Sequence, residues 1–206
     1  MADVLVSVDR TVIATLIGRV AEHVMAHAEE LTALDQAIGD GDHGINMKRG
    51  LTAVMAEIEA IAAQPLPDAL KAAGMQMVMK VGGASGPLYG TLVMGLSREL
   101  TAAPTRAEAV AAFAAAIEAV KARGKAKAGD KTMLDVLIPV QAAAADGADM
   151  ATLRRVAAQA AEATVGMQAR RGRASFLGER SVGHMDPGAR SSQLMVEAVC
   201  DVLENA

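Results

Sequence analysis

Three aspartates in a glycine-rich stretch are the residues of this sequence best suited to metal chemistry. Asp35, Asp40 and Asp42 fall within the stretch LDQAIGDGDHGIN. Asp40 and Asp42 are two residues apart, so a turn can bring their carboxylates together, and Asp35 can reach the same point from the end of the preceding element. Carboxylate oxygens suit Mg²⁺, which also takes substrate phosphates as ligands. The structural alternative is a turn rich in Asp and Gly that also caps a helix.

The charge of this cluster narrows the chemistry. The spacing does not fit a calcium-binding EF-hand, because Gly44 stands where an oxygen ligand is needed and Ile45 where the glycine is needed. The repulsion energy between a carboxylate and one negative charge of a phosphate is roughly 4 kcal/mol at a separation of about 4 Å and an effective dielectric constant of about 20. Three aspartates beside a polyphosphate therefore require divalent cations between them.

A second segment, GGASGPLYGT at residues 82–91, is suited to anion binding. Small residues before a helix leave backbone N–H groups free at the positive end of the helix. Ser85 adds a hydroxyl group. A tight turn between two helices is the structural alternative.

A third segment, GKAKAGDKTM at residues 124–133, nearly matches a P-loop. We reject a P-loop, because Asp130 interrupts the register and the segment follows a helix instead of a strand. Gly124 still permits a nucleotide ring to approach the backbone, and Met133 offers a soft apolar contact. A mobile basic loop is the alternative.

A fourth segment, residues 172–189, is long for a connection in a compact bundle, and long loops are often lids or binding loops. Arg173 and Arg180 are candidate phosphate ligands. A surface ion pair is the favoured interpretation for Arg180.

The composition predicts an all-α fold. Hydrophobic residues make up 52% of the 206-residue chain, yet it has two Phe, one Tyr and no Trp. Ala, Leu and Met are strong helix formers, whereas the aromatic strand formers are nearly missing. Helix caps and prolines predict eight helices in a single domain, residues 1–206. The expected N-caps are Asp9, Asp68, Asp130, Asp149 and Asp186, and Thr105 with Glu108 forms an expected capping box. The expected helices cover 9–30, 45–63 and 68 to about 82, and begin near 87, 105, 131, 150 and 187.

Charge and cysteine content exclude several classes. The net charge of −4 gives no basic footprint for nucleic acid. Cys200 is the single cysteine, which excludes a disulfide framework. The first ten residues lack the features of a signal peptide, and no apolar run is long enough to span a membrane. We therefore expect a cytoplasmic protein without a membrane or nucleic-acid partner.

Together the four segments resemble the L subunit of dihydroxyacetone kinase, the nucleotide-binding half of that enzyme. The stretches LDQAIGDGDHGINMKRG, GGASGPLYGT, GDKTMLDVLIP and GRASFLGERSVGHMDPGA look like its family motifs in order. The resemblance covers essentially the whole chain, with Phe176 standing where Tyr is more usual. It implies a barrel of eight antiparallel helices with the nucleotide site at one rim.

The resemblance also implies roles for individual residues. Asp35, Asp40 and Asp42 would bind two Mg²⁺ ions, and Arg173 would act in catalysis and close the site. The remaining residues implied to contact ADP or ATP are His43, Gly44, Ile45, Asn46, Ala84, Ser85, Gly124, Met133, Asp186, Pro187 and Gly188.

The implied reaction is phosphoryl transfer to dihydroxyacetone, which is held covalently by a histidine of a separate K subunit. In one branch of the family ATP is the donor. In the other, the L subunit retains ADP, which a phosphohistidine protein, the M subunit, converts to ATP. The length of the chain favours the second branch, and whether it forms a homodimer stays open. The alternatives are a kinase for another small ketose, a Mg²⁺-dependent phosphohydrolase and a non-catalytic helical adaptor.

Overall fold

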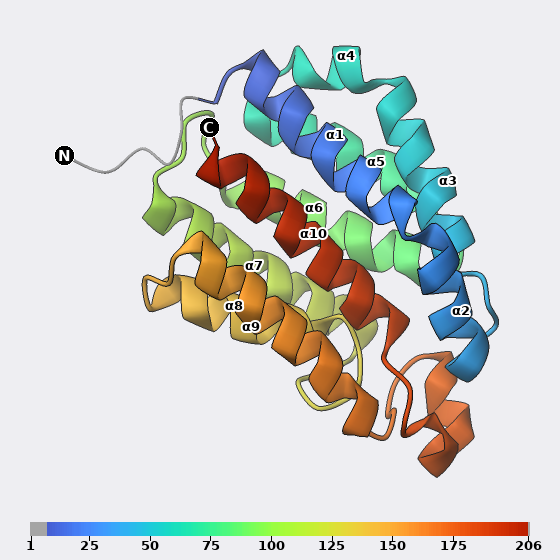
Figure 1. The fold of residues 1–206 in the computed structure, drawn as a ribbon. Helices are drawn as coiled ribbons and strands as arrows, with labels where there is room; N and C mark the ends of the chain where they lie inside the picture. The colour runs from blue at the N-terminus through green and yellow to red at the C-terminus, as the bar shows by residue number, and fades with distance from the viewer. Residues whose placement is uncertain (1–7, 206) are drawn as a thin grey trace.

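The computed structural model describes residues 8–205. Residues 1–7 and 206, which belong to the expected domain and include most of the segment tested for a signal peptide, lie outside the described part. Within that part the chain forms helices and no strand, as expected (Figure 1). The α-helices are α1 (Arg10–Ala26), α2 (Ala28–Ile38), α3 (His43–Ala56), α4 (Ile58–Ala62), α5 (Leu66–Lys80), α6 (Ser85–Glu99), α7 (Arg106–Gly124), α8 (Leu134–Ala145), α9 (Met150–Ala163) and α10 (Pro187–Glu204). Two 3₁₀ helices, η1 (Thr164–Gly166) and η2 (Arg173–Ser181), lie between α9 and α10.

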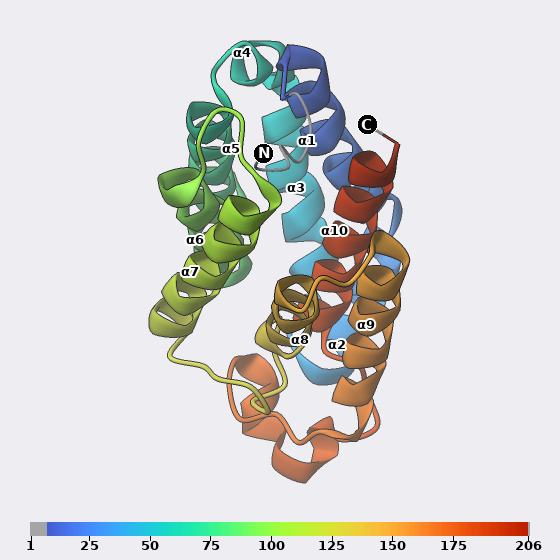
Figure 2. The same cartoon turned by 90° about the vertical axis from the view of Figure 1, so that its left-hand side faces the viewer.

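Eight of the helices form a closed ring. In chain order, α1, α3, α5, α6, α7, α8, α9 and α10 each contact the next, and α10 closes the ring against α1. Successive helices of the ring run in opposite directions (Figures 1 and 2). The helices α2 and α4 are additions at the two ends. The expected all-α barrel of eight antiparallel helices is thus confirmed.

The up-and-down order decides which connections meet. In such a ring the connections alternate between the two ends, so every second connection lies at the same rim. One end of the barrel therefore carries four connections, the last of which contains η2 (Figure 2). They are residues 39–42, 81–84, 125–133 and 167–186. These stretches overlap the four glycine-rich segments on which the sequence placed its candidate chemistry.

Side-chain caps fix several of the helix starts. Asp9, Asp149 and Asp186 each accept a hydrogen bond from a backbone N–H of the first turn that they precede. Thr105 and Glu108 form the expected capping box of α7. Each of these four predictions from the sequence is confirmed.

Two expected caps are wrong. Asp68 lies inside the first turn of α5, which begins at Leu66 after Pro65. Asp130 does not cap a helix at Lys131; its Oδ2 instead accepts the N–H of Lys127 at 2.9 Å, within the loop. The helix α8 begins only at Leu134, because Lys131 adopts a left-handed backbone with φ of 61°.

Two expected helices are each divided. The region expected to be one helix over 9–30 breaks at His27 and continues as α2 to Ile38. The region expected over 45–63 breaks at Glu57, between α3 and α4. The continuation to Ile38 puts Asp35 on the last turn of a helix, where its position is fixed.

The core is aliphatic and tightly packed. Its main cluster draws buried Leu, Ile, Val, Met and Ala from α1 to α8 and from α10, while a second cluster joins α8, α9 and α10. Small residues allow close contact between helices: a Cβ atom on Gly95 of α6 would lie 2.8 Å from the Cα of Ala116 on α7. No helix of the described residues is long and apolar enough to cross a membrane.

Candidate functional site

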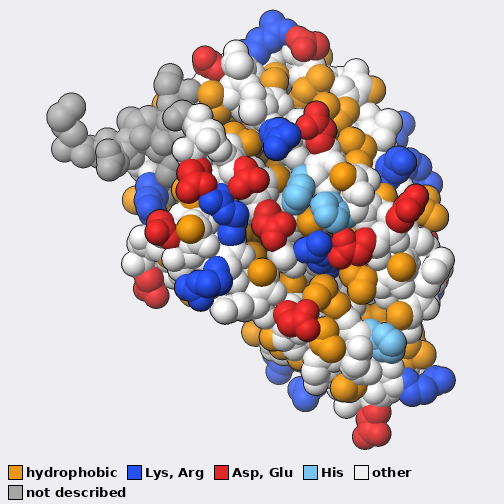
Figure 3. Space-filling model, in the orientation of Figure 1, with side chains coloured by type: hydrophobic (Ala, Val, Ile, Leu, Met, Phe, Trp, Pro, Cys, Tyr) orange, Lys and Arg blue, Asp and Glu red, His pale blue; other side chains and the backbone are white. Residues whose placement is uncertain are grey.

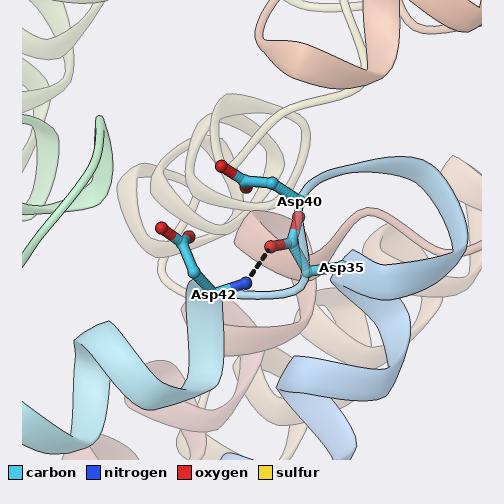
Figure 4. A group of neighbouring side chains, drawn as sticks. All are labelled: Asp35, Asp40 and Asp42. Atoms are coloured by element: carbon cyan, nitrogen blue, oxygen red, sulfur yellow. Dashed lines mark hydrogen bonds between the residues drawn. The ribbon is translucent and has the colours of Figure 1, made fainter.

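The three aspartates meet at the rim of the barrel. One carboxylate oxygen from each of Asp35, Asp40 and Asp42 lies within 4.8 Å of the others. Asp35 comes from the end of α2, and Asp40 and Asp42 come from the turn that leads into α3 (Figure 4). The Oδ2 atom of Asp35 accepts the backbone N–H groups of Asp42 at 2.8 Å and His43 at 3.1 Å. These bonds fold the turn back over Asp35, so that all three carboxylates converge.

Gly39 leaves room for this arrangement. A Cβ atom at residue 39 would lie 2.0 Å from Oδ1 of Asp35. Any side chain there would displace the buried carboxylate. Hard oxygen donors at this spacing fit a divalent cation such as Mg²⁺, which binds through carboxylates and keeps waters and phosphates as further ligands.

Arg173 partly balances the negative charge of the cluster. Its Nε lies 2.7 Å from Oδ2 of Asp40. The arginine belongs to the capping segment, which we define as residues 167–186 between η1 and α10. The pair therefore joins the capping segment to the aspartate turn.

The aspartates border a cleft with an empty volume of about 800 Å³, counting the part open to solvent. The helices α3, α6, α8 and α10 all begin at its lining or within two residues of it. The first N–H groups of a helix have no partner within the helix, and they give its start a partial positive charge. Four helix starts around one cleft, with three carboxylates at its edge, are suited to binding a phosphate chain together with a cation.

Most of the residues expected to bind nucleotide or metal line this cleft. They are Asp35, Asp40, Asp42, His43, Ala84, Ser85, Met133, Arg173, Asp186, Pro187 and Gly188. Gly124 lines a second cavity beside it, which also contains Met133 and the apolar side chains of Leu88, Val120 and Leu134. This second cavity suits a flat, largely apolar ring at the far end of a phosphate chain.

Three expected residues line neither cavity. Gly44 is packed so closely that a Cβ atom would lie 1.9 Å from the carbonyl oxygen of Ala28, and Ile45 is 60% exposed. Asn46 is buried and accepts a hydrogen bond from Nη2 of Arg49 at 2.9 Å. Gly44 and Asn46 thus serve the packing of α3, and the Ile45 side chain faces solvent. Gly44 and Ile45 contribute first-turn N–H groups near the cleft.

His43 connects three of the helix starts. Its Nδ1 lies 2.9 Å from Oγ of Ser85 on α6, and its Nε2 lies 2.9 Å from Oγ of Ser191 on α10. Burial lowers the pKa of His43, against the opposing effect of Asp35 and Asp42. The neutral imidazole has one donor and one acceptor nitrogen, so its tautomer and the direction of the Ser85 hydroxyl are coupled.

Tyr89 and Asp186 extend this buried polar region. The Tyr89 hydroxyl donates to the carbonyl oxygen of Gly188 at 2.9 Å and lies 2.6 Å from Oγ of Ser191. Burial raises the pKa of Tyr89 to about 12, so the hydroxyl stays protonated. Burial also raises the pKa of Asp186 to about 7, although the N–H of Ala189 donates to its Oδ2 at 2.7 Å.

The sequence did not single out several residues that shape the site. Tyr89 and Lys131 line the cleft, and both fall in segments already noted for their glycines. The buried Asp135 accepts the N–H groups of Gly129 at 2.5 Å and Thr132 at 2.7 Å, which fixes the loop before α8. Its position three residues after Thr132 is the one signal that could have indicated this role. Arg180, expected in a surface ion pair, forms none with the described residues.

Charge on the outer face gives no further site. Figure 3 shows acidic and basic side chains interspersed over the face formed by α1 and α10. One surface pair joins Nε of Arg190 on α10 to Oε1 of Glu30 on α2 at 2.7 Å. Pairs at exposed positions contribute little to stability.

Comparison with known proteins agrees with the motifs. The DAK2 domain family matches residues 37–201. The ADP-binding subunit DhaL of PEP-dependent dihydroxyacetone kinase 1 from Listeria innocua is 46% identical over 179 residues, 86% of this chain and 89% of the relative. The corresponding Escherichia coli (strain K12) subunit is 40% identical over 201 residues, 93% of this chain and 96% of the relative.

The fold agrees as well. The dihydroxyacetone kinase of C. freundii, solved in complex with AMP-PNP and Mg²⁺, matches with a TM-score of 0.73 at 22% identity. The match covers 93% of this chain, which spans 34% of that longer protein. The resemblance drawn from the sequence motifs is confirmed: the chain belongs to the DAK2 domain family, that of the L subunit of dihydroxyacetone kinase.

Proposed function

We propose that this chain is the ADP- and ATP-binding subunit of a dihydroxyacetone kinase. The observation that carries the proposal is the meeting of three carboxylates and four helix starts around one cleft. Carboxylates alone would repel a nucleotide, and helix starts alone would accept any anion. Together they select a phosphate chain that brings divalent cations. The names of the Listeria innocua and Escherichia coli relatives support ADP as the ligand.

In this proposal Asp35, Asp40 and Asp42 hold two Mg²⁺ ions. Bound there, the ions would neutralise charge on the phosphate oxygens and align them for transfer. The donor set fits, since all three side chains offer hard oxygen ligands and Gly39 keeps Asp35 in place. Oδ2 of Asp35 accepts two backbone N–H groups, whereas its Oδ1 accepts none from residues 8–205 and can bind a cation.

The other residues of the chain bind and orient the nucleotide. The starts of α3 and α6, with the Ser85 hydroxyl, face the phosphates. The cavity beside Gly124 and Met133 takes the base. Arg173 lies at the rim beside Asp40, where its positive charge would stabilise a phosphoryl group during transfer. Phosphoryl transfer depends mainly on such positioning and charge stabilisation, and no side chain here is needed as a nucleophile.

The partners follow from the same proposal. The triose would be held by a separate K subunit, and an M subunit carrying phosphohistidine would convert bound ADP to ATP. The PEP-dependent names of the relatives support this branch of the family. A single domain over residues 1–206 and a cytoplasmic location stay predictions.

The test compares two aspartate variants. Asp40→Ala should lose Mg²⁺-dependent binding of ADP in calorimetric titrations, while its circular dichroism stays helical. Asp146→Ala removes an exposed carboxylate at the end of α8, outside both cavities, and should bind ADP as the wild type does. Unchanged Mg²⁺-dependent binding in Asp40→Ala would contradict the proposal.

Two assays separate the rival functions. Mass spectrometry of the small molecules released from freshly purified protein should find ADP, which a non-catalytic adaptor would lack. Incubation with ATP alone should give no steady release of phosphate; sustained turnover without a partner would indicate a phosphohydrolase. With a K subunit present, a panel of small ketoses would identify the acceptor.

A further inference from the structure

Lys131 is a buried lysine to which the proposed nucleotide site assigns no role. It is 1% exposed, whereas the chain's other lysines, all within the described residues, are exposed or partly exposed. Its backbone has φ of 61°, in the left-handed region that residues with a side chain rarely adopt. Both features are unfavourable, because burial removes the ammonium from water and the backbone is strained. Such outliers are kept where the surrounding structure or the function requires them.

The contacts of Lys131 show what it holds. Its Nζ donates to the carbonyl oxygen of Met167 at 3.0 Å and to that of Ser181 at 2.6 Å. Among the described residues, no carboxylate lies within 4.0 Å of this nitrogen. The ammonium therefore donates hydrogen bonds to two backbone carbonyl groups and forms no ion pair with the described residues.

The two carbonyl groups belong to opposite ends of the wall that closes the cleft. Met167 begins the capping segment and Ser181 ends η2. Between them lie residues 171–174, which line the nucleotide cleft, and two of these also line the second cavity. Lys131 thus fastens both ends of this wall to the loop between α7 and α8.

The other attachments of the capping segment are weaker. The N–H of Arg170 donates to the carbonyl oxygen of Asp130 at 3.0 Å. At the far end of the segment, the N–H of Gly183 donates to the carbonyl oxygen of Val165 at 2.8 Å, and the N–H of Asp186 donates to Oγ1 of Thr164 at 3.0 Å. A small apolar cluster joins Ala169 and Ala174 to Ile38 of α2. The pair between Arg173 and Asp40 is largely exposed. Hydrogen bonds from a charged donor are stronger than neutral ones, so the two bonds from Lys131 are the strongest polar attachments of the segment.

We propose that Lys131 is a positioning residue that clamps the capping segment onto the loop between α7 and α8 and thereby slows the release of bound nucleotide. The effect on nucleotide rests on the proposed function, since it assumes that ADP occupies the cleft. The clamp itself does not depend on that assumption and can be tested without nucleotide.

The first experiment measures hydrogen exchange in the nucleotide-free protein. The amides of Ala169, bonded to Oγ of Ser181, and Gly183, bonded to the carbonyl oxygen of Val165, report on the two ends of the segment. Lys131→Met should speed their exchange at least tenfold, because two charged hydrogen bonds are lost. Core amides of α6 and α7 should change much less.

The matched control is Lys125→Met. Lys125 lies in the same loop with a similar left-handed backbone, φ of 48°, but its side chain is exposed. This variant should leave the exchange of both reporter amides within twofold of the wild type. Lys131→Arg, which keeps a cation with several N–H donors, should restore most of the protection. Exchange in Lys131→Met within twofold of the wild type would overturn the clamp.

The second experiment measures the release of a fluorescent ADP analogue by displacement with unlabelled ADP. Lys131→Met should release it at least tenfold faster, and Lys125→Met at the wild-type rate. Faster amide exchange without faster release would overturn the link to nucleotide. If the wild type bound no ADP, the proposed function would be wrong. The hydrogen-exchange experiment, which uses nucleotide-free protein, would still test whether Lys131 holds the capping segment.

A third measurement needs no variant to fold. Because Lys131 is the one buried lysine of the described residues, the wild type should show a single slowly exchanging ¹⁵N-ammonium signal in NMR spectra. The ammonium groups of exposed lysines exchange rapidly with water. Absence of this signal would contradict the buried, hydrogen-bonded ammonium on which the proposal depends.

Discussion

Arg173 Nε lies 2.7 Å from Oδ2 of Asp40, which joins a candidate catalytic cation to a candidate metal ligand. The arginine side chain is 70% exposed and that of the aspartate 36%, so solvent screens the pair. An exposed pair of this kind contributes about 1 kcal/mol or less to stability. The pair therefore matters for the position of Arg173, because it keeps a positive charge at the edge of the proposed phosphate site.

Replacing Arg173 should separate function from stability. Arg173→Ala should lower the rate of phosphoryl transfer with the partner subunits by at least tenfold, since a charged contact to phosphate is worth about 1.5–3 kcal/mol. The free energy of unfolding should fall by no more than about 1 kcal/mol. Coupled assays and urea denaturation measure the two effects.

Arg180→Ala is the matched control for this variant. Arg180 is also exposed on η2 but forms no ion pair with the described residues. Its replacement should leave both the rate and the stability near the wild-type values. An equal loss of rate in the two variants would indicate a general effect of charge and not a role for Arg173.

Gly39→Ala should damage the metal site without replacing any of its ligands. The new methyl group would lie 2.0 Å from Oδ1 of Asp35, so the carboxylate would have to move. Overpacking of this kind costs about 1–3 kcal/mol, and here the strain acts directly on the Asp35 carboxylate. We therefore expect the affinity for Mg²⁺ with ADP to fall at least tenfold in calorimetric titrations. Gly166→Ala, whose Cβ would meet nothing within 4 Å, should bind normally. Tight binding by Gly39→Ala would show that the position of Asp35 is unimportant.

Asp186 should make stability depend on pH. Burial raises its pKa from 3.8 to about 7. Between these values the folded chain binds more protons than the unfolded chain, so the free energy of unfolding falls as pH rises from about 4 to about 7 and then levels off. Each pH unit in this window corresponds to about 1.4 kcal/mol at most.

Asp186→Asn should flatten this dependence, as measured by urea denaturation of the nucleotide-free protein across the window. Asp149 is the control, because it caps α9 in the same way but is exposed, and the N–H of Thr152 lowers its pKa. Asp149→Asn should keep the wild-type slope between about pH 4 and 7. A slope in Asp186→Asn equal to that of the wild type would rule out Asp186 as its source.

Tyr89→Phe should test the buried hydroxyl network. The hydroxyl lies against the carbonyl oxygen of Gly188 and the side chains of Ser191 and Ser192. Its removal leaves buried polar groups without a partner, so urea denaturation should show a loss of about 1–3 kcal/mol. Ser192→Ala should cost less, since Tyr89 keeps its two other partners. A smaller loss in Tyr89→Phe than in Ser192→Ala would contradict the central position of Tyr89.

The helical class, four of the caps and the four chemical segments could be predicted from the sequence. They depend on local properties: Ala and Leu favour helices, Asp and Thr cap them, and glycines allow tight turns. The proximity of Asp35 to Asp40 and Asp42 was also within reach, because these residues are close along the chain.

The tertiary structure alone decided how distant residues meet. Ser85 and Ser191 contact the two nitrogens of His43, and Lys131 reaches Met167 and Ser181, across separations that no local pattern encodes. Closure of the ring brings the four segments to one rim, and burial then sets the ionisation of groups such as Asp186. The sequence determined which residues could bind a phosphate chain, whereas the packing of helices determined that they surround the same cleft.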